Sequence, residues 1–138
     1  MNKLNFSVLT MGLVITFSAM AEESMTKEAY KSEKEKIEQE YKLDKAKCKT
    51  LVKNAKDICK AEAKGKEEVA EAELAAKNKP SSKSRQKANL AKAKADYKIA
   101  KEKCDDLAGD TKDVCKKEAE AAMTAAKTDA KTQIEDSH

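Results

Sequence analysis

The chain has 138 residues, a formal net charge of +4, and Asp, Glu, Lys or Arg at 39% of its positions. After residue 21 it holds only fourteen Leu, Ile, Val and Met residues, three tyrosines, and no Phe or Trp. This composition excludes a large hydrophobic core, and its abundance of Ala, Lys and Glu favours long helices. Disorder is the competing interpretation for so charged a chain. Helix propensity, capping signals and paired cysteines favour order.

The first segment, residues 1–21, has the pattern of a secretory signal peptide. A positive start at Lys3 precedes an apolar run from Phe6 to Phe17, and Ala19-Met20-Ala21 supplies an A-x-A cleavage site. We therefore predict cleavage after Ala21 and a periplasmic or secreted protein whose thiols are oxidised. No later stretch is apolar enough to span a membrane.

An internal duplication organises the remaining residues. Tyr41, Cys48 and Cys59 recur 56 positions later as Tyr97, Cys104 and Cys115. Further matches include the pairs Leu51/Leu107, Lys60/Lys116 and Asp57/Asp113. A repeat of this length indicates two copies of one supersecondary unit. We predict a first helical-hairpin repeat at 22–79 and a second at 80–138.

Helix breaks are predicted at three places. Pro80-Ser81-Ser82 separates the repeats, because proline cannot continue a helix. In the second repeat, Gly109 suits the left-handed residue after a helix, with Asp110 as the next N-cap and Asp113 in the capping-box position. The matching sites of the first repeat are Asn54 and Asp57, and Lys53 stands in place of the glycine.

A heptad pattern predicts which face of the helix before the second turn is buried. One row of this seam is Leu90, Tyr97 and Cys104, and the other is Ala93, Ala100 and Leu107. After the turn the predicted seam is mostly alanine: Ala119, Ala122, Ala126 and Ala130, with Met123 and Ile134 as fillers. Pairs at i,i+4, such as Glu62–Lys66, are expected on the solvated faces.

Four cysteines allow two serious connectivities. Helix-turn-helix repeats would pair Cys48 with Cys59 and Cys104 with Cys115. A single long antiparallel hairpin turning at Pro80–Ser82 would instead pair Cys48 with Cys115 and Cys59 with Cys104. The turn signals favour the first, so we predict an all-α fold of two disulfide-stapled helical hairpins in an elongated four-helix arrangement. The long hairpin is the alternative.

Motifs for catalysis are missing from the sequence. The one histidine is His138, the last residue, and the chain has no Ser-His-Asp set, no phosphate-binding glycine loop and no CxxC. We predict no enzyme, cofactor or metal site, and structural disulfides at all four cysteines. Charges of both signs are interspersed, which does not favour specific nucleic-acid binding.

The paired Tyr-x6-Cys-x10-Cys segments resemble an exported bacterial Ala/Lys-rich family, often labelled TolA-like or cell-envelope biogenesis proteins by composition. The resemblance covers Tyr30 to about Lys131 and implies a secreted helical protein without an established activity. Family members often carry Asn at the position of Asp110 and Gly at that of Lys53. A looser resemblance, to mitochondrial twin-CX9C hairpins, bears on the long-hairpin alternative.

Three functions follow as hypotheses. The first is a non-enzymatic periplasmic protein with a structural, interaction or envelope-stress role. It would act on an unknown protein partner or by self-association, and one version of this hypothesis is chaperone-like. The rival is a thiol-redox or metal-handling protein using the four cysteines. A weaker alternative is polyanion binding through lysine-rich faces, with steep salt dependence as its signature.

Overall fold

Four antiparallel helices follow one another along the chain. The structure, a computed structural model, describes residues 25–135. The helices are α1 (Lys27–Lys47), α2 (Lys53–Asn78), α3 (Ser82–Cys104) and α4 (Gly109–Glu135), with a short 3₁₀ turn, η1 (Cys48–Thr50), after α1. The all-α prediction is confirmed, and the long-hairpin alternative is wrong because the chain reverses after Lys47 and again after Cys104. The predicted signal peptide lies outside the described residues.

Side chains at the helix starts explain two of the boundaries. Thr26 caps α1 by accepting a hydrogen bond from the backbone N–H of Ala29 at 3.2 Å. Ser81 caps α3 in the same way, and the hydroxyl of Ser84 accepts from the Ser81 backbone N–H in return. The boundary predicted at Pro80 therefore falls between α2 and α3, where a proline and a capping box act together.

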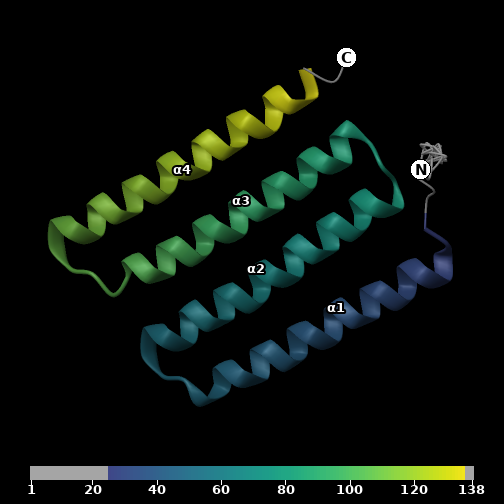
Figure 1. The fold of residues 1–138 in the computed structure, drawn as a ribbon. Coiled ribbons are helices and arrows are strands. Elements are labelled where there is room, and N and C mark those ends of the chain that lie inside the picture. The colour runs from purple at the N-terminus through teal and green to yellow at the C-terminus, as the bar shows by residue number, and fades with distance from the viewer. Residues whose placement is uncertain (1–24, 136–138) are drawn as a thin grey trace, which may run out of the picture.

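The helices form a single open layer in chain order (Figure 1). Among the described residues, α1 packs against α2, α2 against α3, and α3 against α4, and helices further apart in this order do not contact one another. The two inner helices, α2 and α3, therefore have neighbours on two sides. None of the helices in this part of the chain is both long and apolar enough to cross a bilayer.

The inner helices bury small residues two positions apart. Ala63 and Gly65 are both buried in α2, and Ala93 and Ala95 are both buried in α3. Residues separated by two positions point about 200° apart on a helix. Ala63 lines the groove between α1 and α2, whereas Gly65 lies against Ala95 of α3. Each inner helix thus carries two apolar stripes on opposite sides.

The predicted seam is correct only in part. Ala93, Cys104, Ala119, Met123 and Ala130 are buried, but Ala122 is exposed. Leu107 is 40% exposed because α3 ends three residues before it. Ile134 lies beyond the side chains that the structure describes. A heptad pattern assumes one buried stripe, and it therefore could not identify the second stripe of α3.

Candidate functional site

Both disulfides lie at the same end of the layer, each beside a helical turn. Cys48 is bonded to Cys59 and Cys104 to Cys115, with Cα–Cα distances of 5.5 and 5.7 Å. These are the pairings favoured from the sequence. In each bond the first cysteine is almost completely buried, with Cys48 1% and Cys104 0% exposed, while the second is half-buried. The described chain contains no free cysteine.

The two turns share one backbone hydrogen bond and one left-handed residue. The N–H of Leu51 donates to the carbonyl of Cys48 at 3.2 Å, and the N–H of Leu107 donates to the carbonyl of Cys104 at 3.1 Å. Lys53 and Gly109 then open the next helix with φ values of 52° and 58°. The duplication in sequence is therefore a duplication in structure, even though the first turn has lysine where glycine is favoured.

The capping roles predicted around these turns are wrong. Gly109 has the expected left-handed φ, but it opens α4 instead of following the end of α3. Asp110 and Asn54 therefore lie inside the first helical turn and are not N-caps. Asp57 forms an ion pair with Lys60 at 3.2 Å, and Asp113 lies further inside α4. The helices start two residues earlier than predicted, because the left-handed residue is itself the first residue of the helix.

Asn54 instead connects the two repeats. Its side-chain Nδ2 donates a hydrogen bond of 2.7 Å to the backbone carbonyl of Glu102, in the last turn of α3. The same carbonyl also accepts from the backbone N–H of Asp105 at 3.1 Å, so Asn54 adds a second donor at the end of α3. The start of α2 and the end of α3 are thereby joined at the disulfide end.

Asp105 closes the second turn with two ion pairs. Its carboxylate lies 2.9 Å from Nζ of Lys112 and 3.0 Å from Nζ of Lys116, both on α4. A hydrogen bond from Lys112, the largest cause, and a second from Lys116 lower the pKa of Asp105 from 3.8 to about 2. The matching residue of the first repeat is Lys49, which has the opposite charge. The duplicated turns are therefore held by different electrostatics.

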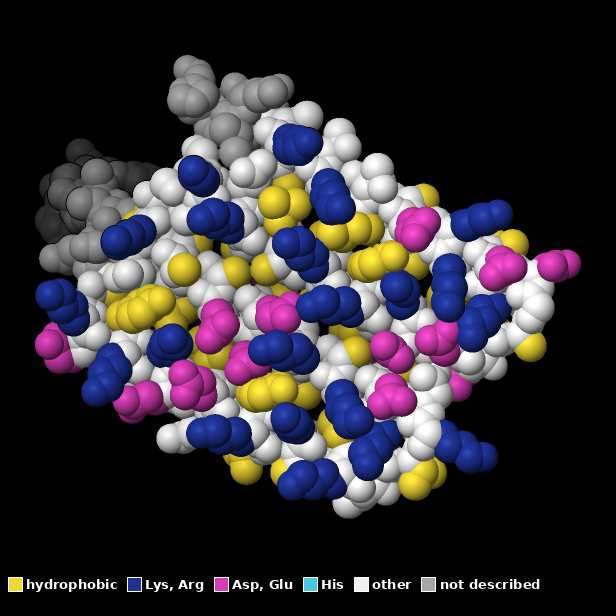
Figure 2. Space-filling model, turned by 180° about the vertical axis from the view of Figure 1, so that it is seen from behind, with side chains coloured by type: hydrophobic (Ala, Val, Ile, Leu, Met, Phe, Trp, Pro, Cys, Tyr) yellow, Lys and Arg dark blue, Asp and Glu magenta, His cyan; other side chains and the backbone are white. Residues whose placement is uncertain are grey.

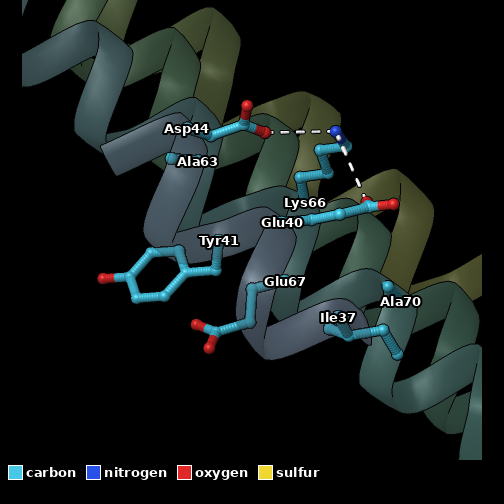
Figure 3. Close-up of a pocket in the computed structure, with 8 residues that line it drawn as sticks. All are labelled: Ile37, Glu40, Tyr41, Asp44, Ala63, Lys66, Glu67 and Ala70. Atoms are coloured by element: carbon cyan, nitrogen blue, oxygen red, sulfur yellow. Dashed lines mark hydrogen bonds and ion pairs between the residues drawn. The ribbon is translucent and has the colours of Figure 1, made fainter. Parts of the chain in front are cut away.

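Asp44 has the equivalent role between α1 and α2. Lys66 lies 3.1 Å from Asp44 and 3.8 Å from Glu40 (Figure 3). Hydrogen bonds from Lys47 and Lys66 lower the pKa of Asp44, and the bond to Asp44 raises the pKa of Lys66. The predicted Glu62–Lys66 pair within α2 is wrong, since Glu62 lies instead 3.8 Å from Lys103 of α3. Lys66 and Lys103 therefore form ion pairs between neighbouring helices.

The duplicated tyrosines pack beside lysines on the same side of their hairpins. Lys64 and Lys45 lie 5.3 and 5.5 Å from the ring centre of Tyr41. Lys101 lies 5.4 Å from the ring centre of Tyr97, whose hydroxyl is 3.4 Å from Glu120. Such cation–π contacts stabilise modestly at exposed sites. The tyrosines thus brace each hairpin.

Grooves between the helices are shallow or open. The groove between α1 and α2, lined by Ile37, Tyr41 and Ala70 among others, encloses about 40 Å³, space for little more than water. A more open groove of about 290 Å³ lies next to it and is lined by Asp44, Lys47, Cys59, Glu62, Ala63 and Lys66. Within the described residues, no group of three or more His, Cys, Asp and Glu side chains could hold a metal ion.

Exposed large apolar side chains gather at the disulfide end. In the described chain they are Leu43, Leu51, Val52, Leu107 and Val114, and Val52 is 72% exposed. All five lie in the two turns or within a few residues of them. The one broad face seen in Figure 2 is different, since Lys, Arg, Asp and Glu side chains are spread over it, with hydrophobic side chains visible between them. Sequence patterns did not identify this end as apolar, although the repeated Leu51/Leu107 pair was a signal for it.

Comparison with known proteins gives no match to a family model, to a curated protein sequence or to a solved structure. The geometry of the described residues therefore carries the functional argument.

Proposed function

We propose that the chain is a non-enzymatic periplasmic protein that acts by binding another protein on its helical layer. The observation that carries the proposal is the open layer itself. A closed bundle hides the inward face of every helix, whereas α2 and α3 each expose two sides to solvent here. Disulfides and ion pairs between helices hold this layer in one shape, and a preformed surface loses little entropy on binding.

The chaperone-like version of this function is not the one we propose. It predicts a concave apolar patch on the folded helices. The exposed large apolar side chains of the described residues lie at the disulfide end instead. A protein partner with charged groups of both signs fits the broad faces better than an unfolded client does.

Site-specific photo-crosslinking in cells tests the proposal. A crosslinking residue at Lys94 or Lys117, exposed positions in the middle of α3 and α4, should capture a partner protein as a discrete band. The same residue at Lys79, an exposed position in the turn between α2 and α3 and not on a broad face, is the matched control. Failure to capture a partner from any exposed position on either face would overturn the proposal. Export itself stays a prediction, which N-terminal sequencing of the mature protein checks.

A thiol-redox function is the second candidate, and one observation favours it. Cys59 lines the open groove that also contains Lys47 and Lys66. Nearby lysines stabilise a thiolate and so promote thiol–disulfide exchange. Titration of the native protein with a glutathione redox buffer distinguishes the candidates. Selective reduction of the Cys48–Cys59 bond would favour redox chemistry, and resistance of both bonds would favour the binding function.

A further inference from the structure

The two turns at the disulfide end carry opposite charge although they are copies of one another. Residues 45–60 contain six lysines and one aspartate, for a formal charge of +5. The matching residues 101–116 contain four lysines, four aspartates and one glutamate, for a formal charge of −1. We call these segments the basic turn and the acidic turn.

Both turns also expose apolar side chains at this end. Leu51 and Val52 belong to the basic turn, and Leu107 and Val114 belong to the acidic turn. Contiguous exposed apolar groups on a charged protein commonly mark an interaction site. Because the helices alternate in direction, the α1–α2 turn and the α3–α4 turn lie side by side at one end of the layer (Figure 1). The bond from Asn54 to Glu102 fixes one turn beside the other.

We propose that two copies of the chain pack end to end through these turns. A two-fold axis perpendicular to the layer, passing between α2 and α3, places the basic turn of each copy against the acidic turn of the other. Each contact then occurs twice, as a two-fold interface requires. An axis lying in the plane of the layer, across the helices, would instead place two basic turns together and is opposed by like-charge repulsion.

The same contact covers the exposed apolar side chains. Leu51 and Val52 of one copy meet the region of Leu107 and Val114 of the other, so apolar surface and charge are satisfied together. The end of a single layer is narrow compared with the roughly 800 Å² per partner of a standard interface. We therefore expect a dimer in the micromolar range that weakens as salt is added. This inference is independent of the proposed function, since a partner can bind the broad faces of either a monomer or a dimer.

Charge reversal in matched pairs tests the arrangement. One variant, Lys49→Glu with Lys53→Glu and Lys56→Glu, lowers the formal charge of the basic turn by six, from +5 to −1, so that both turns are acidic. A second variant, Asp106→Lys with Asp110→Lys and Asp113→Lys, raises the formal charge of the acidic turn by six, from −1 to +5, so that both turns are basic. In sedimentation velocity of the oxidised protein, each variant alone should show a dissociation constant raised by at least about tenfold. An equal mixture of the two should form a heterodimer at least as stable as the wild-type dimer.

Two further variants keep the outcome decisive. Lys77→Glu with Lys79→Glu and Lys83→Glu changes the same number of charges at the opposite end of the layer and should leave dimerisation unchanged. Val52→Ser, at a highly exposed side chain, should weaken the dimer without affecting the fold, which circular dichroism and disulfide mapping verify. A wild-type protein that stays monomeric throughout the micromolar range overturns the proposal. So does a protein that stays monomeric yet sediments with anionic phosphatidylglycerol vesicles, because the apolar end would then serve membrane binding.

Discussion

Gly65 of α2 lies directly against Ala95 of α3. A Cβ added to Gly65 would lie 2.8 Å from the Cβ of Ala95, closer than such atoms approach in proteins, and 3.5 Å from its Cα, an ordinary van der Waals contact. Gly65→Ala should therefore destabilise the protein by about 1–2 kcal/mol, although alanine improves helix propensity by about 1 kcal/mol. Urea unfolding of the oxidised protein measures the change.

The matched position in the second repeat supplies a control for this contact. Ala121 is exposed, because α4 has no neighbour on that side. Ala121→Gly should cost about 1 kcal/mol by propensity alone. The double variant Gly65→Ala/Ala95→Gly should recover most of the packing loss. Equal stability of Gly65→Ala and wild type would contradict the close contact.

Lys53 and Gly109 offer opposite substitutions at equivalent positions. A left-handed φ costs an L-residue about 1–2 kcal/mol, a cost that glycine avoids. Part of this gain is offset because glycine has a larger conformational entropy in the unfolded chain. Lys53→Gly should stabilise the protein by up to about 1 kcal/mol, and Gly109→Ala should destabilise it by about 1 kcal/mol. No atom lies within 4 Å of a Cβ built on Gly109, so backbone strain alone decides the second effect. Thermal unfolding of both variants with disulfides intact checks the signs, and a loss of stability in Lys53→Gly would contradict the strain.

Removing either disulfide should destabilise the protein strongly. Each bond joins cysteines eleven positions apart, and a closed loop of this size stabilises by about 3 kcal/mol in the chain-entropy model. The double variants Cys48→Ala/Cys59→Ala and Cys104→Ala/Cys115→Ala should therefore lose similar amounts in urea unfolding. Because the core is mostly alanine, the fully reduced protein should lose much of its helical circular dichroism. A reduced protein as helical and stable as the oxidised one would contradict this role.

Asp105 should make stability depend on pH in a narrow acidic range. Its folded pKa of about 2 is below the ordinary 3.8, so the ionised carboxylate favours the folded state. This contribution is complete above the unfolded pKa and is lost as pH falls through the folded pKa. Asp105→Asn should therefore be less stable than wild type at neutral pH, and the difference should disappear as pH falls from 3.8 to about 2. A carboxyl NMR titration of Asp105 provides the direct measurement, and an ordinary pKa would contradict the ion pairs.

Asn54 should contribute to stability as a hydrogen-bond donor. Asn54→Ala should cost about 1 kcal/mol, because the carbonyl of Glu102 loses its side-chain partner. Asn54→Asp is nearly the same size but brings a carboxylate beside that carbonyl, so its cost should be larger. Amide hydrogen exchange at the end of α3 should speed up in both variants. If Asn54→Asp were as stable as wild type, the hydrogen bond from Asn54 to Glu102 would not contribute to the stability of the fold.

The local features of the fold could be predicted from the sequence. The helix break at Pro80, the left-handed Gly109 and the disulfide pairs depend on residues within about a dozen positions of one another. Short loops and turn residues decide such features largely without tertiary context. The capping roles of Asn54 and Asp110 were wrong by two positions, because the left-handed residues Lys53 and Gly109 are themselves the first residues of α2 and α4.

Most of the candidate site depended on tertiary structure. The residues next to Asn54 in the sequence do not predict its hydrogen bond to the carbonyl of Glu102. Gly65 lies in an alanine-rich segment where glycine and alanine look interchangeable, and only the structure shows that Ala95 packs against it.

By itself, the amino-acid sequence determined that this chain is helical and duplicated, and its turn signals favoured two hairpins that are each closed by a disulfide, a pairing that the structure confirms. Only the tertiary structure decided that the hairpins join through α2 and α3 into an open layer, with an acidic and a basic turn side by side. The physical reason is that alanine faces pack almost equally well in several arrangements. A few specific contacts, such as Gly65 against Ala95 and Asn54 with Glu102, therefore select one of them.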